Sequence, residues 1–141
     1  MNVYKFPVGD WSKVGHGKCE WFIVKSPATI EEIREAHFNC NEKLGFDIGE
    51  MASEYCDYTI PYKTLIKLVK LNIMKINVDE YEDYEYEIDN PKEMIDIWIK
   101  ILNKVNPKLK LKLENVESIN FQGKDDRDRH LKTPGFGLFC D

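Results

Sequence analysis

The residues best suited to chemistry in this sequence are a histidine and a cysteine that a predicted helix would place on one face. His37 and Cys40 are three positions apart, so a helix turns both side chains to the same side. With Cys19 or Cys56 they could form a tetrahedral metal site, or the thiol could act as a nucleophile beside the imidazole. Zinc sites usually carry two paired-ligand motifs, and this chain offers one. We therefore expect a core histidine bonded to a backbone carbonyl and a small apolar cysteine, and we assign no metal and no cofactor.

A second set of candidate ligands lies in a charged stretch near the C-terminus. Arg127 and Arg129 precede His130, and a guanidinium group offers a planar fork of donors to a phosphate or a carboxylate. Together with His37 and Cys40, these residues would serve a small-molecule-binding protein or a small enzyme if the fold brings the distant segments together. Three interleaved aspartates favour instead a solvated linker whose charges satisfy each other.

The most unusual composition lies in residues 79–89, where seven acidic residues are interleaved with tyrosines. Carboxylates beside rigid tyrosine rings resemble what a basic, nucleic-acid-binding groove would accept in place of phosphates and bases. The alternative interpretation is an acidic strand and loop whose charge is balanced by the lysines of 108–112. The predicted partner-binding residues are Glu80, Glu82, Asp83, Tyr84, Glu85 and Glu87.

Composition limits the classes of function that remain. The chain has 141 residues, 43% of them hydrophobic, which suits one globular domain spanning 1–141. The net charge of -5 argues against direct binding to nucleic acid, and no apolar run is long enough to span a membrane. The N-terminal residues do not resemble a secretion signal, so we expect a cytoplasmic protein whose four cysteines are thiols. No catalytic signature is recognisable, and we assign no catalytic residue.

The element that must organise the fold is a predicted helix that begins at Asn90-Pro91 and ends at Val105 before Asn106-Pro107. Its apolar side chains cover more than half of the helical wheel, which is typical of a buried helix. The flanking segments 84–88 and 108–113 alternate apolar and charged residues, as strands do. Short connections predict a βαβ unit over 81–113 in which the two strands run parallel.

The remaining pattern predicts an α+β fold in a single two-layer domain, with a mixed sheet of about four or five strands packed by about three helices. We cannot assign residues 73–78, which fit both a helix and a strand. The other expected elements are an edge strand at 3–8, a central strand at 19–25, a helix from Ser26-Pro27 or Thr29 to Leu44, a short helical turn at 48–51, a helix from Thr59 or Pro61 to Lys70, and a last strand at 118–122.

These observations favour an interaction protein over an enzyme. We expect a small acidic protein that binds and blocks a protein partner with a basic surface, for example a surface that binds nucleic acid. An inhibitor carried by a phage or another mobile element against a bacterial defence enzyme fits the small size, the acidity and the missing catalytic motifs. The apolar tail 134–140 should dock on this core or on another chain, so a homo-oligomer is a further expectation.

Overall fold

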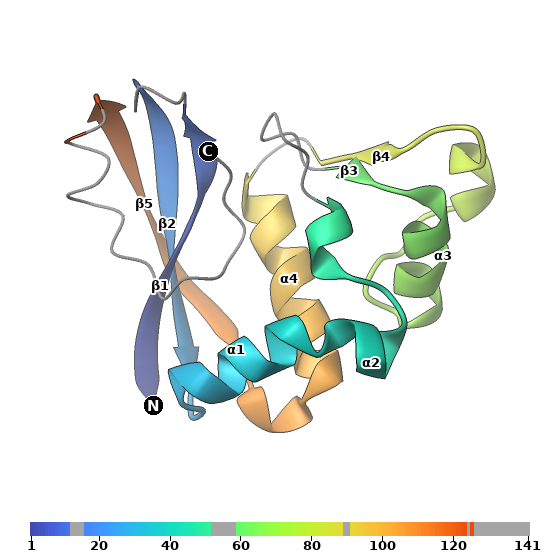
Figure 1. Ribbon diagram of the computed structural model, residues 1–141, viewed down its shortest axis with the longest axis horizontal. Helices are drawn as coiled ribbons and strands as arrows, with labels where there is room; N and C mark the ends of the chain where they lie inside the picture. The colour runs from blue at the N-terminus through green and yellow to red at the C-terminus, as the bar shows by residue number, and fades with distance from the viewer. Residues whose placement is uncertain (12–15, 52–58, 89–90, 124, 126–141) are drawn as a thin grey trace.

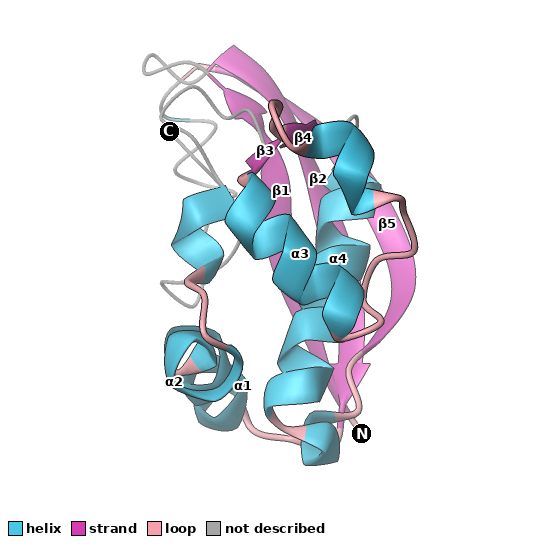
Figure 2. Cartoon of the chain, turned by 90° about the vertical axis from the view of Figure 1, so that its right-hand side faces the viewer, coloured by secondary structure: helices cyan, strands magenta, loops and turns pink. Residues whose placement is uncertain are grey.

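The computed structural model describes residues 1–11, 16–51, 59–88, 91–123 and 125. These residues form an α+β fold with four α-helices and two antiparallel sheets, one of three strands and one of two. The helices lie together on one side of the three-stranded sheet (Figures 1 and 2). In the part of the chain that is described, no helix has the length and apolar character needed to cross a bilayer.

The three-stranded sheet has the order β1-β2-β5, with β1 at Asn2–Trp11, β2 at His16–Ser26 and β5 at Lys112–Gln122. Both pairings are antiparallel. β2 is the central strand and β1 an edge strand, as predicted. The signal for β2 was its apolar residues on both faces, which indicate a strand buried on both sides. Phe22 pairs with Phe6 on one side and Val116 on the other, so the inward face of the sheet is apolar.

The predicted helix after β2 begins and ends where the sequence indicates, but it is two helices. The capping box at Thr29 and Glu32 is confirmed: the Thr29 hydroxyl accepts from the Glu32 backbone N–H at 3.2 Å. Gly45 ends the second helix with φ +82°, a conformation that glycine adopts without strain. The two helices meet at Asn39: α1 is Ile30–Phe38 and α2 is Cys40–Leu44.

The other predicted helices are also found, whereas residues 73–77 form neither helix nor strand. The helical turn predicted at 48–51 is confirmed as a 3₁₀ helix. The remaining elements are η1 at Ile48–Met51, β3 at Thr59–Ile60, α3 at Tyr62–Lys70, η2 at Val78–Tyr81, β4 at Tyr86–Glu87, α4 at Pro91–Val105 and η3 at Pro107–Leu109.

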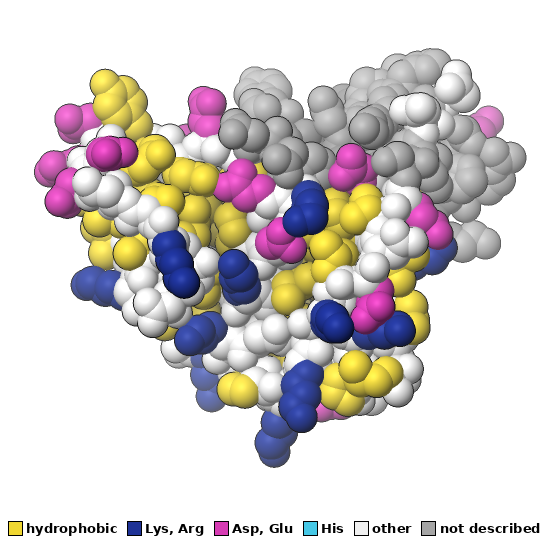
Figure 3. Space-filling model, turned by 180° about the vertical axis from the view of Figure 1, so that it is seen from behind, with side chains coloured by type: hydrophobic (Ala, Val, Ile, Leu, Met, Phe, Trp, Pro, Cys, Tyr) yellow, Lys and Arg dark blue, Asp and Glu magenta, His cyan; other side chains and the backbone are white. Residues whose placement is uncertain are grey.

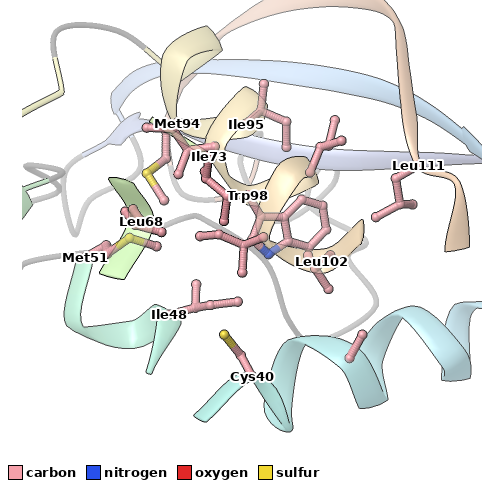
Figure 4. Packing of buried hydrophobic residues seen from close by; sticks show 14 of the residues in the cluster. Cys40, Ile48, Met51, Leu68, Ile73, Met94, Ile95, Trp98, Leu102 and Leu111 are labelled. Atoms are coloured by element: carbon pink, nitrogen blue, oxygen red, sulfur yellow. The ribbon is translucent and has the colours of Figure 1, made fainter. Parts of the chain in front are cut away.

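Helix α4 is the buried centre of the fold, as its wide apolar face predicts. Trp98 is fully buried and its ring meets Phe6 of β1 edge to face, with ring centres 4.8 Å apart. Figure 4 shows side chains from α2, η1, α3 and the segment after α3 converging around Trp98. Because α4 contacts both the sheet and the other helices, its side chains join them in one hydrophobic core.

The prediction of a parallel βαβ unit over 81–113 is wrong. The strand before α4, β4, pairs antiparallel with β3, while β5 pairs antiparallel with β2, so the two flanking strands are in different sheets. The reason lies in the link after α4. Lys110 adopts φ +46°, and the Asn103 side chain bonds both the N–H and the C=O of Leu111, at 2.9 and 3.1 Å. These bonds occupy the backbone of a segment that the alternating pattern assigns to a strand.

Replacing Lys110 by glycine should therefore stabilise the protein by about 0.5 kcal/mol. The left-handed conformation costs a side chain with a Cβ about 1 kcal/mol, and the greater entropy of glycine in the unfolded chain offsets part of the gain. Urea unfolding of K110G and wild type measures the difference. K108G is the matched control, because Lys108 is also exposed but lies in a right-handed 3₁₀ turn, and it should lower stability. Equal losses in both variants would contradict the assignment of strain to Lys110.

Candidate functional site

The predicted partner-binding residues lie in a surface segment of defined conformation, residues 79–87, here called the acidic segment. Its first part is the 3₁₀ helix η2, capped by the Asn77 side chain, which accepts from the Asp79 backbone N–H at 3.3 Å. The Tyr84 N–H donates to the Tyr81 carbonyl at 3.0 Å, and β4 then pairs with β3. The backbone of the segment is thus ordered by a cap, a turn and a short ladder.

Two of the three tyrosines fix the acidic segment to the core. The rings of Tyr81 and Tyr86 lie 5.4 Å apart at 59°, and both side chains are half-buried against the hydrophobic cluster. The Tyr86 hydroxyl donates to a Glu93 carboxylate oxygen on α4 at 2.6 Å. Tyr84 differs from both, since 71% of its surface is exposed. Tyr84 is therefore the aromatic side chain of the segment that is available to a partner.

All carboxylates of the acidic segment are exposed, and none forms an ion pair with a residue in the described ranges. Six of the nine residues in this segment are acidic and none is lysine or arginine, so the segment has a high local negative charge. Figure 3 shows acidic side chains gathered at one upper corner of the molecule. The alternative interpretation, balancing by the lysines of 108–112, is not observed among the described residues: no ion pair joins the two groups, and β4 and β5 lie in different sheets. The acidic residues are Asp79, Glu80, Glu82, Asp83, Glu85 and Glu87.

The arrangement can bind cationic groups by charge and can supply one aromatic contact. No known family, curated protein or solved structure matches this chain. Its function must therefore be inferred from its own surface. Carboxylates that lie in solvent without cationic partners keep their charge available for a basic surface.

The His37 side chain has a partner inside the protein. The indole N–H of Trp98 donates to His37 Nδ1 at 3.0 Å, so this nitrogen is an acceptor and carries no proton. The partner of Nδ1 is thus an indole N–H, a contact that we did not predict from the sequence. Burial lowers the pKa of His37 below 6.5, with a smaller opposing effect from Asp47. The imidazole is neutral at pH 7, and its Nδ1 lone pair is occupied.

Cys40 has the environment of a structural cysteine. Its side chain is 1% exposed. Burial, and to a smaller extent the negative charge of Asp47, together raise the pKa of the thiol to about 12. The thiolate is the form that attacks electrophiles and binds metals, and this thiol stays protonated at neutral pH. Among the residues that the structure describes, no three His, Cys, Asp or Glu side chains lie close enough together to hold a metal ion.

Stability should fall as the pH is lowered through the range in which His37 takes up a proton in the unfolded chain. Because its folded pKa lies below 6.5, the unfolded state binds the proton first, and stability is lost as the pH drops below that value. We expect a loss of about 1 kcal/mol between pH 7.5 and 5.5. Urea unfolding at both pH values measures it. In H37Q the loss should be much smaller, and an equal loss would show that another group is responsible.

The structure leaves the other ligand candidates untested. Arg127, Arg129 and His130 lie outside the described residues, as does the tail 134–140. The structure therefore does not show whether they approach His37 or Cys40.

Sequence reasoning missed one surface feature, a hollow between α4 and the segment after α3. Its rim includes Lys75, Lys92 and Lys100, with buried isoleucines beneath. Lys92 and Lys100 lie eight positions apart on α4. This spacing was a visible signal, because residues so spaced lie near one face of a helix. The contribution of Lys75 had no signal, since residues 73–77 have no regular structure from which its direction could be predicted.

Proposed function

We propose that this protein binds a protein partner with a basic surface and blocks it, and that the acidic segment is the contact surface. The observation that carries the proposal is the concentration, around the exposed ring of Tyr84, of six exposed carboxylates that form no ion pair with any residue the structure describes. Like charges held this close repel each other, and a basic partner would relieve that repulsion. Tyrosine supplies contact area with little loss of side-chain entropy.

The conformation of the acidic segment supports binding without a large ordering cost. The cap at Asn77, the tilted contact between the rings of Tyr81 and Tyr86 and the bond from Tyr86 to Glu93 hold the backbone before any partner arrives. A surface ordered in advance loses less entropy on association, so more of the contact energy appears as affinity.

The proposal includes a specific biological setting, the cytoplasm of a bacterium, where a phage or mobile-element protein would inhibit a nucleic-acid-binding defence enzyme. An acidic surface of this kind would compete with phosphates for lysine and arginine side chains of the enzyme. In this proposal the chain 1–141 is a single domain that acts by binding rather than by catalysis.

Affinity capture from the native host with two baits tests the proposal. Wild-type protein should retain a basic protein, and salt should release it, because exposed charge contacts are screened. The bait E82K/E85K/E87K should not retain that protein. Recovery of the same protein by both baits, or of no basic protein by the wild type, would contradict the proposal.

A further inference from the structure

A groove with an apolar floor and a cationic rim runs along the outer side of α4. It consists of two adjoining hollows of about 500 and 470 Å³ that share Ile73 and Lys100. The floor includes Ile73 and Ile97, which are 4% and 5% exposed. Lys75 borders one hollow and Lys104 the other. We call this feature the lysine groove.

The lysine groove has a net positive rim, because four lysines border it against two carboxylates, and both carboxylates have partners of their own. Glu93 accepts from the Tyr86 hydroxyl at 2.6 Å, and Asp96 pairs with Lys92 at 3.1 Å. The other rim lysines, 75, 100 and 104, are exposed and form no ion pair within the described ranges. An occupant that matches both features is anionic and carries an apolar group for the floor.

The acidic segment of this same protein has these properties. It presents carboxylates on both sides of the exposed Tyr84 ring, and the groove offers lysines around buried isoleucines. We propose that a second copy of the chain docks its acidic segment in the lysine groove, with Tyr84 over the apolar floor. Charge complementarity between the two surfaces and the match of an aromatic ring to an apolar floor are the arguments for this occupant.

The two surfaces adjoin, which makes a closed dimer possible. Tyr86 borders the lysine groove, and its neighbours Glu85 and Glu87 belong to the acidic segment. Figure 3 shows Lys and Arg side chains spread over the surface below the acidic corner. A two-fold axis between adjoining complementary patches brings each segment to the groove of the other copy. The proposal uses the surface of the proposed function, so a second copy and a basic partner would compete for it.

Sedimentation velocity with charge-swapped variants tests the dimer. Wild type should form a dimer at low ionic strength and dissociate at high ionic strength. The groove-reversed variant K75E/K100E/K104E and the segment-reversed variant E82K/E85K/E87K should each weaken the dimer by about 100-fold, because the symmetry removes every contact twice. An equimolar mixture of the two variants should form a heterodimer, since each copy then meets its complement at both contacts.

The control mixture pairs the groove-reversed variant with E31K/E35K/E42K. Those three glutamates are exposed on α1 and α2, so this variant has the same net charge as the segment-reversed one but an intact acidic segment. It should form its own dimer, because its segment and its groove are intact, but it should not associate with the groove-reversed chain, which carries a fluorescent label so that its sedimentation is followed alone. A wild type that stays monomeric at low salt, a groove reversal without effect, or equal association of the labelled groove-reversed chain in both mixtures would overturn the dimer. Capture of a basic partner by the groove-reversed bait shows separately whether the proposed function holds.

Discussion

Replacing Trp98 by alanine should lower the free energy of unfolding by about 3–5 kcal/mol, enough to unfold a domain of ordinary stability. The indole is fully buried on α4, packs edge to face on Phe6 at 4.8 Å and donates to His37 at 3.0 Å. Its removal leaves a cavity at the point where the sheet and the helices meet. Urea unfolding measures the loss, and circular dichroism shows whether the variant folds at all.

The variant W98F separates packing from hydrogen bonding. Phenylalanine keeps most of the ring but leaves His37 Nδ1 without its donor, and we expect a loss of about 1–3 kcal/mol. A loss in W98A no greater than in W98F would mean that the volume of the indole contributes little. That result would contradict the central position assigned to α4.

Reversing three charges of the acidic segment should weaken binding to the basic partner by at least about 100-fold, or about 2.7 kcal/mol. The variant E82K/E85K/E87K removes attractive contacts and places like charges opposite each other. All three side chains are exposed and form no ion pair with a described residue, so the fold should tolerate the change. Titration calorimetry with the captured partner measures the affinity, and unfolding measurements show whether the variant is folded.

Two further variants show which feature of the acidic segment binds. E31K/E35K/E42K also reverses three exposed glutamates, so it changes the net charge equally at another place and should keep most of the affinity. Y84A keeps every charge and should lose about tenfold, because a central aromatic contact is often worth more than 1 kcal/mol. Equal losses in the two triple variants would show that only net charge matters.

The sequence predicts the helices well because the signals for them are local. The apolar arc of α4 spans one helix, and the cap at Thr29 and Glu32 needs four residues. The glycine that ends α2 at Gly45 is likewise recognised from its neighbours. Each of these features depends on contacts within one or two turns, so one sequence contains the whole signal.

Strand pairing could not be predicted, because alternation indicates which face is buried and does not name the partner. Leu109 and Leu111 are both buried, as an alternating pattern implies, yet a 3₁₀ turn and the left-handed Lys110 place them there. The true partner of β5 is β2, whose paired residues lie 87 to 106 positions earlier in the chain, from Lys25 with Lys112 to His16 with Gln122. Such a long-range pairing is decided by packing of the whole core, which a local pattern does not contain.

The acidic segment could be located from composition alone, but its exposed part could not. Composition does not separate the three tyrosines by burial, whereas in the structure Tyr81 and Tyr86 pack against the core and Tyr84 is exposed. A two-residue strand and a 3₁₀ turn replace the regular strand that would have fixed the alternation. The lysine groove was predictable only on its α4 side, since the other side needs the irregular segment after α3 to lie against α4.

Nuclear magnetic resonance mapping of the partner contact on the isotope-labelled protein tests the central claim most directly. Amide signals of residues 79–87 should shift when the captured basic partner is added, and the shifts should diminish at high salt. Signals of β1, β2 and β5 should stay in place. Shifts centred on that sheet, with residues 79–87 unaffected, would show that the acidic segment is not the contact surface.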